Sequence, residues 1–121
     1  MCSSDLPDLA REILKAARAS IPRAMKSFAP DGGCPEGPGY WGYATRYTVF
    51  YLAALQTALG TDFGFKKLPG FADAGMFRIH SVGPLGETFN FADAGNRAGT
   101  TMQMMWFSRE FDRQQIGRAH V

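Results

Sequence analysis

The chain has 121 residues, of which 45% are hydrophobic and 20% charged, values typical of one modest globular domain and not of a disordered chain. The formal net charge is only +2 and the basic residues are scattered, so nothing in the sequence indicates a nucleic-acid-binding surface. No apolar run approaches the roughly 18 residues that a membrane span needs, and the N-terminus lacks the basic and apolar regions of a signal peptide.

The residues at both ends of the chain are those that a laboratory DNA sequence encodes. Residues 116–121 are what ATC GGA AGA GCA CAC GTC encodes, a common sequencing-library adapter, and residues 2–6 are encoded by the reverse complement of the same adapter core. We therefore predict that residues 1–6 and 116–121 are adapter-derived and that residues 7–115 are an internal piece of a longer protein.

Outside these flanks the chain keeps one cysteine, Cys34, and one histidine, His80. A single cysteine gives neither a disulfide framework nor a metal cluster, so no metal and no cofactor are expected. His80 lies in a predicted strand, where we expect a structural, hydrogen-bonded residue.

The first predicted helix covers residues 8–26, where apolar residues recur at spacings of three and four between lysines and arginines. Pro22 is expected to kink this helix or to split it in two, with Ser20 capping the second part. The turn residues of the segment 28–33 end it.

A second helix is predicted to begin between Pro38 and Trp41 and to end at Leu59, because Gly60 is a C-terminal stop signal. Its second half, residues 49–55, is apolar nearly all round, which indicates burial on several sides. We therefore expect this helix to lie between neighbouring helices of a larger array.

The rest of the chain predicts shorter elements. Residues 76–82 and 87–91 flank a Gly-Pro-Leu-Gly turn and predict a small β-hairpin. A last helix is expected over residues 102–111. The predicted fold class is mainly α, with the hairpin near residues 76–91 as its β part.

Gly37, Gly39 and Gly42 satisfy the string G-x-G-x-x-G. Dinucleotide binding needs a strand before this string, and the preceding residues 31–36 are rich in Gly and Pro and do not predict one. We interpret the glycines as a means for a loop to pack tightly against the start of a helix.

All four tyrosines fall within one stripe of the second predicted helix, which is either core packing or a functional row. Tyr40 and Tyr43 lie in its first turns, where free N–H groups and the helix dipole favour a phenolate. Arg46 follows Tyr43 by one turn and is placed to stabilise that anion. A free phenol titrates near pH ~10, so a proton-transferring tyrosine needs such help. Tyr47 and Tyr51 lie deeper and are expected to be structural.

Glu36 immediately precedes the second helix. It either caps backbone N–H groups of the first turn or takes part in the site, and the residues alone leave both interpretations open.

The amino-acid sequence of several segments resembles that of the heparinase II/III-like polysaccharide lyases. The resemblance begins with Asp31-Gly32-Gly33 and residues 35–45, PEGPGYWGYAT. It continues, in register and order, over residues 58–64 (ALGTDFG), 69–71 (PGF) and 83–93 (GPLGETFNFAD). It covers nearly all of residues 8–115, and one departure is Cys34, where the family pattern has a bulky aromatic residue.

This resemblance implies that residues 7–115 are a middle slice of an incomplete (α/α) toroid, followed in the whole protein by antiparallel β-sandwich domains. It implies cleavage of an acidic, uronic-acid-containing polysaccharide, heparan-sulfate-like or alginate, by β-elimination. The location that it implies is periplasmic or secreted. The partner that it implies is the remainder of the parent polypeptide, without which the exposed apolar helix faces of residues 7–115 lower their stability.

The resemblance also implies roles for single residues. Tyr43, or as a second choice Tyr40, transfers the proton, and Glu36, Trp41 and Arg46 bind substrate. The Asn-His pair upstream and the histidine downstream that the family uses fall outside the slice, so we expect the chain alone to be inactive. Two alternatives remain: a non-catalytic helical carbohydrate-binding or scaffold module, and a helical module of unrelated function with the tyrosines as core.

Overall fold

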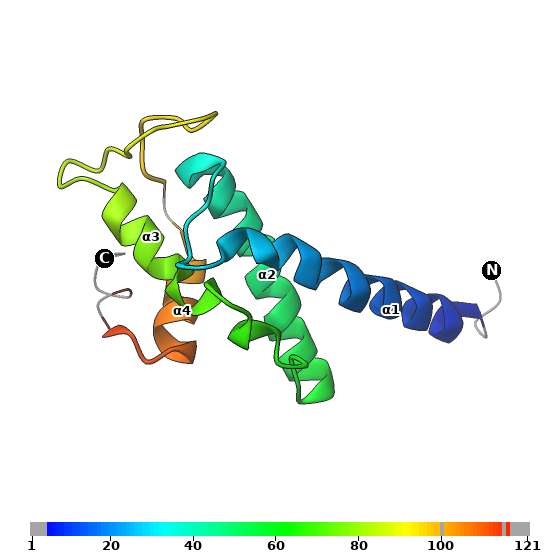
Figure 1. Ribbon diagram of the computed structural model, residues 1–121. Coiled ribbons are helices and arrows are strands. Elements are labelled where there is room, and N and C mark those ends of the chain that lie inside the picture. The colour runs from blue at the N-terminus through cyan, green and yellow to red at the C-terminus, as the bar shows by residue number, and fades with distance from the viewer. Residues whose placement is uncertain (1–4, 100, 115, 117–121) are drawn as a thin grey trace.

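The computed structural model describes residues 5–99, 101–114 and 116, and in these residues the chain is mainly helical. Residues 1–4 and 117–121, from the two predicted adapter-derived flanks, lie outside them. Helices and 3₁₀ turns follow in the order α1 (Asp5–Met25), η1 (Lys26–Phe28), α2 (Gly37–Leu59), η2 (Phe65–Lys67), η3 (Phe71–Asp73), α3 (Ala74–Ser81) and α4 (Gln103–Glu110). Figure 1 shows α2, α3 and α4 gathered in one body, from which α1 projects as an arm.

The α1 helix is unbroken, so the prediction that Pro22 splits it is wrong. Pro22 lies near the end of the helix, and the carbonyl that loses its hydrogen bond belongs to Arg18, an exposed residue that water can reach. The second half of α1 packs on the body, with Ile21 and Met25 in the core and the Arg18 guanidinium carbon 3.8 Å from the ring centroid of Phe63. The rest carries large apolar side chains that are 42–59% exposed, namely Leu6, Leu9, Ile13 and Leu14.

The α2 helix begins at Gly37, one residue before the predicted range, and ends at Leu59 as predicted. Gly60 follows as the C-cap, and its left-handed backbone (φ 69°) is the conformation that glycine favours at a helix end. One face of α2 is buried, and its large members recur at spacings of eight, three and three residues: Trp41, Val49, Leu52 and Leu55. The predicted burial on several sides is not seen, since Phe50 is 60% exposed on the other face. The exposed face of α2 also carries the tyrosines at 40, 43 and 47.

The core is an aromatic cluster to which distant segments contribute. Phe71 is wholly buried, and its ring centroid lies 5.5 Å from that of Phe28 and 5.1 Å from that of Phe107. Ile116, from the flank predicted to be adapter-derived, is also buried in this cluster. The origin of residues 116–121 stays a prediction. Burial of these rings joins η1, η3 and α4 in one core.

The predicted hairpin near residues 76–91 does not form, and its first half is the helix α3. The buried residues of α3 recur at helical spacing, namely Ala74, Gly75, Arg78 and Ser81. Gly75 lets the helix lie against neighbours that a side chain would meet, since a Cβ there would be 2.8 Å from Ile116. Tertiary packing of this face therefore overrides the strand-like residue types of 76–82.

A loop of residues 82–99 takes the place of the hairpin. Within the described part of the chain, its β structure is limited to two isolated antiparallel bridges, Val82 with Thr88 and Glu87 with Arg97. The predicted Gly-Pro-Leu-Gly turn is present, with the Gly86 N–H donating to the Gly83 carbonyl at 3.0 Å. The loop returns the chain to α4, which has nearly the predicted extent.

Candidate functional site

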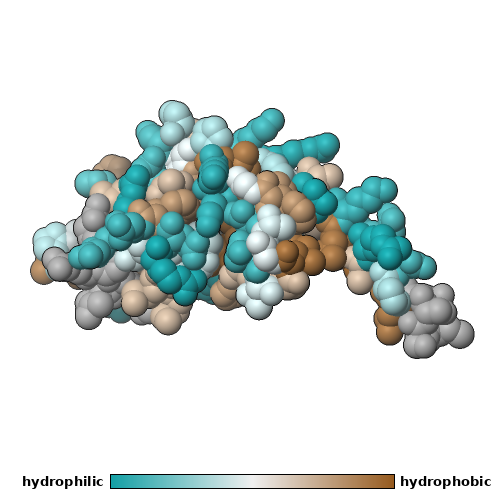
Figure 2. Space-filling model, turned by 90° about the horizontal axis from the view of Figure 1, so that it is seen from below, coloured by the Kyte–Doolittle hydropathy of each residue, from teal (hydrophilic) through white to brown (hydrophobic). Residues whose placement is uncertain are grey.

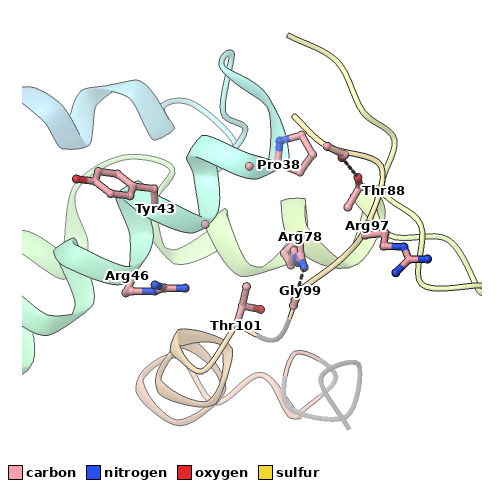
Figure 3. Close-up of a pocket in the computed structure, with 11 residues that line it drawn as sticks. Pro38, Tyr43, Arg46, Arg78, Thr88, Arg97, Gly99 and Thr101 are labelled. Atoms are coloured by element: carbon pink, nitrogen blue, oxygen red, sulfur yellow. Dashed lines mark hydrogen bonds between the residues drawn. The ribbon is translucent and has the colours of Figure 1, made fainter. Parts of the chain in front are cut away.

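A cavity of about 260 Å³ lies where the start of α2, the helix α3 and the segment before α4 meet. Figure 3 shows α2 on one side of it, the segment 95–101 on the other and Arg78 of α3 between them. Eleven residues line it: Pro38, Gly39, Gly42, Tyr43, Arg46, Arg78, Thr88, Gly95, Arg97, Gly99 and Thr101. We call it the arginine pocket, because the charged residues that line it, among those described, are all arginines: Arg46, Arg78 and Arg97.

Glycines at the start of α2 shape one wall of the arginine pocket. Gly37 has φ +87°, and a Cβ there would be 2.5 Å from the carbonyl oxygen of Phe91. The loop backbone can therefore lie directly on the first turn of the helix only because no side chain intervenes. No strand precedes these glycines, and the interpretation of G-x-G-x-x-G as a packing motif holds for Gly37, whereas a Cβ at Gly42 would meet no atom within 4 Å.

Arg78 lies between the two walls. Only 8% of its surface is exposed, and its Nη2 atom donates a hydrogen bond of 2.7 Å to the carbonyl of Gly99. Its guanidinium carbon lies 6.0 Å from the ring centroid of Trp41. Burial lowers the pKa of the Arg78 guanidinium from its ordinary value. The other two arginines, Arg46 and Arg97, are exposed.

A second polar link fixes the walls relative to each other. The Nε2 atom of Gln103, a residue only 4% exposed, donates to the carbonyl of Gly42 at 2.9 Å and to the hydroxyl of Thr45 at 3.0 Å. Thr45 in turn donates to the carbonyl of Trp41 at 2.7 Å. Gln103 follows the wall segment 95–101 by two residues, so it anchors that segment to the first turns of α2.

The structure brings together two of the five residues predicted for the site. Tyr43 and Arg46 both line the arginine pocket, whereas Tyr40, the second candidate for proton transfer, does not. Figure 3 shows the Arg46 guanidinium directed toward the centre of the pocket and the Tyr43 hydroxyl directed away from Arg78. The Tyr43 ring is 63% exposed at the rim, 4.8 Å from the ring of Tyr47 between centroids.

Trp41 and Glu36 do not lie where the sequence placed them. Trp41 was expected to bind substrate, but its ring is wholly buried and has no surface to offer a ligand. It lies 6.3 Å from the ring of Phe77 between centroids and belongs to the core. Glu36 is exposed and occupies the N-cap position of α2, yet its side chain makes no capping hydrogen bond. Glu36 is also absent from the pocket lining.

Three other expectations from the sequence have an outcome here. Tyr47 was expected to lie deeper and is 57% exposed. Tyr51 is partly buried, and its ring stacks on that of Phe65 at 6.4 Å between centroids. His80 lies in a helix, not in a strand, and is exposed.

Sequence reasoning missed Arg78 and Arg97. Arg78 had a usable signal, because a helix over residues 74–81 puts it on the same face as Ala74 and Ser81, where small residues indicate close packing. Arg97 had none, since its place depends on how the loop of residues 82–99 folds back on α2.

The charge pattern of the arginine pocket sets it apart from a second cavity. That cavity, of about 100 Å³, lies between α2 and α4 and mixes both signs of charge. There Lys66 pairs with Glu110 at 3.1 Å, so the charges already satisfy one another. The arginine pocket has no acidic lining residue, and its positive potential favours an anionic ligand.

No protein-family model matches the chain, and no curated protein matches it. Among the described residues, no three His, Cys, Asp or Glu side chains are grouped so that they could hold a metal ion. In the same residues, no helix combines the length and the apolar character required to cross a membrane.

Proposed function

We propose that this chain is a slice of the helical toroid of a polysaccharide lyase that cleaves an acidic, uronic-acid-containing polysaccharide by β-elimination. The resemblance of residues 31–45 to the heparinase II/III-like lyases supports the proposal. The observation that carries it is the arginine pocket, with three guanidinium groups, no acidic lining residue and Tyr43 at its rim. A uronate unit brings the carboxylate that such a pocket attracts.

The reaction needs three groups, and the pocket supplies candidates for two of them. In this proposal the arginines that line the pocket, Arg46 among them, hold the uronate carboxylate, which makes the C5 proton of the sugar more acidic. A base then takes that proton. The C5–H electron pair forms the C4=C5 double bond, the C4–O bond breaks, and an acid protonates the leaving glycosidic oxygen.

Tyr43 is the first candidate for the proton transfer, and Tyr40 is the second candidate because it does not line the pocket. The Tyr43 hydroxyl points away from Arg78, so its side chain must change rotamer to reach a bound sugar. An exposed side chain at the rim is free to make that change. The proposal takes the third group from the remainder of the parent polypeptide.

One observation favours a second candidate, a non-catalytic carbohydrate-binding module. In the present arrangement the three arginines suffice to bind an anionic sugar, and Tyr43 contributes no group directed at it. Such a module binds the same polysaccharide and forms no unsaturated product.

The experiment compares Tyr43→Phe, Tyr40→Phe and Tyr47→Phe in the full-length protein, with uronate polymers as substrate. Unsaturated uronate products are followed by their ultraviolet absorbance, and polymer binding is measured separately. We expect Tyr43→Phe to lower the rate by at least about 100-fold with binding retained. Tyr47→Phe is the matched control, an exposed tyrosine one turn further along α2 and outside the pocket lining.

Two results would count against the lyase. If wild-type protein binds the polymer and releases no unsaturated product, the non-catalytic module replaces it. If product forms and neither Tyr43→Phe nor Tyr40→Phe slows it, the proton transfer belongs to another residue.

A further inference from the structure

Arg78 is a buried cation without an acidic partner among the described residues. The ion pairs found in that part of the chain use Arg11, Lys66, Arg109 and Arg113, and none reaches Arg78. We propose that the Arg78 guanidinium is the binding site, or seat, of an oxyanion of the ligand, a carboxylate or a sulfate ester. The negative charge of this group neutralises the buried positive charge of Arg78. This inference rests on the proposed function and names the residue that holds the charged group of the substrate.

The geometry leaves the guanidinium with donors to offer. Its planar fork carries five N–H groups, and Nη2 donates to the carbonyl of Gly99. That bond and the contact with Trp41 hold the guanidinium in place at the floor of the cavity. A side chain that is fixed before binding loses little rotamer freedom when an oxyanion pairs with it, which favours affinity.

The energetics point the same way. A buried charge is costly unless it is paired, and a structural arginine in a core is normally given a carboxylate. Here the pocket lining adds two further guanidinium groups, Arg46 and Arg97, and no acid among the residues that the structure describes. The positive electrostatic potential of the three arginines favours an anion in the pocket. Without the anion, the unpaired charge of Arg78 lowers the stability of the free protein.

The size of the cavity limits what binds there. At about 260 Å³ it is smaller than the roughly 300–1,000 Å³ of pockets for drug-sized ligands. It therefore takes one charged group with the sugar ring that bears it, and the rest of the polymer lies outside.

The test measures binding and stability of the 121-residue chain, which separates it from the activity assay on the full-length protein. Oligogalacturonate presents only carboxylates, sulfated dextran oligomers present only sulfate esters, and neutral dextran is the blank. Arg78→Met removes the charge and keeps an unbranched chain. Arg23→Met is the matched control, because Arg23 is an exposed arginine of α1 outside both cavities.

We expect Arg78→Met to raise the Kd of at least one oxyanion polymer by about tenfold or more, with the Tm of the free protein unchanged or raised. A loss confined to oligogalacturonate assigns the seat to a uronate carboxylate, and a loss confined to sulfated dextran assigns it to a sulfate ester. Loss of both assigns it to oxyanions in general. Arg23→Met should leave both Kd values unchanged.

An unchanged Kd for both polymers overturns the proposal, as does binding that falls only in proportion to a lowered Tm. If Arg78→Met does not fold, Arg78→Gln replaces it, since its shorter side chain keeps an amide donor and carries no charge. Weakened binding with an unchanged Tm in Arg78→Gln then supports the seat, and unchanged binding refutes it. Absence of lyase activity in the full-length protein leaves this binding result standing, so the two proposals fail separately.

Discussion

The helices α1 and α2 both leave apolar side chains in solvent, but the two faces differ in chemistry and in surroundings. On α1 they are aliphatic, among them Leu9 and Ile13, and neither cavity described above takes a lining residue from this helix. On α2 they are aromatic, apart from Leu59 at the end of the helix, and among them Tyr43 lines the arginine pocket. Figure 2 shows hydrophobic surface gathered beside the base of the projecting arm.

This difference separates two reasons for exposing apolar surface. An aliphatic helix face can be buried against another apolar surface but offers no polar group to a ligand, and the α1 face is of this kind. Aromatic rings with polar tips can lie against a sugar and still meet water. On α2 the rings of Tyr43, Tyr47 and Phe50 follow one another at centroid distances of 4.8 and 6.5 Å, leading away from the pocket.

The largest expected effect comes from the buried side of α2. Trp41→Ala should destabilise the chain by about 3–5 kcal/mol, because the indole is wholly buried and leaves a cavity. Leu9→Ala on α1 is the matched control and should change stability by less than about 0.5 kcal/mol, since Leu9 is 47% exposed. Urea unfolding measures both. A loss in Leu9→Ala as large as that in Trp41→Ala would mean that the arm folds back and buries its face in solution.

The next effect comes from the link between α4 and α2. Gln103→Met keeps the volume but removes the donor to Gly42 and Thr45, and it should destabilise by about 1–3 kcal/mol. It should also weaken binding of oligogalacturonate, because the segment 95–101 loses its anchor. Gln56→Met is the control, as Gln56 is exposed on α2. Thermal unfolding measures the stability, and calorimetric titration measures the binding of oligogalacturonate. A stable variant with unchanged binding would show that the pocket wall does not depend on the Gln103 hydrogen bonds.

Sequence reasoning succeeded for α2 because both of its ends are signalled locally, by Pro38 in the first turn and by Gly60 at the stop. It failed for α3, whose residue types favour a strand until packing against α2 and α4 is considered. Arg46 and Tyr43 were predicted together because they share one helix. Arg78 and Arg97 join them from segments more than 30 residues further along the chain, and no local pattern encodes that meeting.

The division of the tyrosine stripe has the same origin. Periodicity put all four tyrosines on one face of α2, which is correct, but it could not say which face is buried. The buried face is set by Trp41 and Leu52, which meet residues of other elements in the core. Only Tyr51 among the four turns partly toward that core, and it marks the border between the two faces of the helix.

The smallest expected effect lies at this border. The hydroxyl of Tyr51 is buried without a hydrogen-bond partner among the described residues, so Tyr51→Phe should be neutral or stabilising by up to about 1 kcal/mol at pH 7. Burial raises the pKa of Tyr51 above its ordinary value of 10.0, against an opposing effect of Arg18. The folded state then holds this proton more tightly than the unfolded state. Its contribution is therefore fully present below the unfolded pKa and is lost as the pH rises through the folded one.

Burial likewise raises the pKa of the Cys34 thiol from its ordinary value of 9.0. Its contribution to stability is therefore also lost as the pH rises. The Tm of the wild-type chain should therefore fall above about pH 9, and the fall should be smaller in Tyr51→Phe and in Cys34→Ala. The double variant should show the smallest fall, because the two side chains titrate separately. Tyr47→Phe, at an exposed position on the same stripe, should follow the wild-type curve. If Tyr47→Phe flattens the curve as much as Tyr51→Phe, the two tyrosines share one environment and the border drawn between the faces of α2 is misplaced.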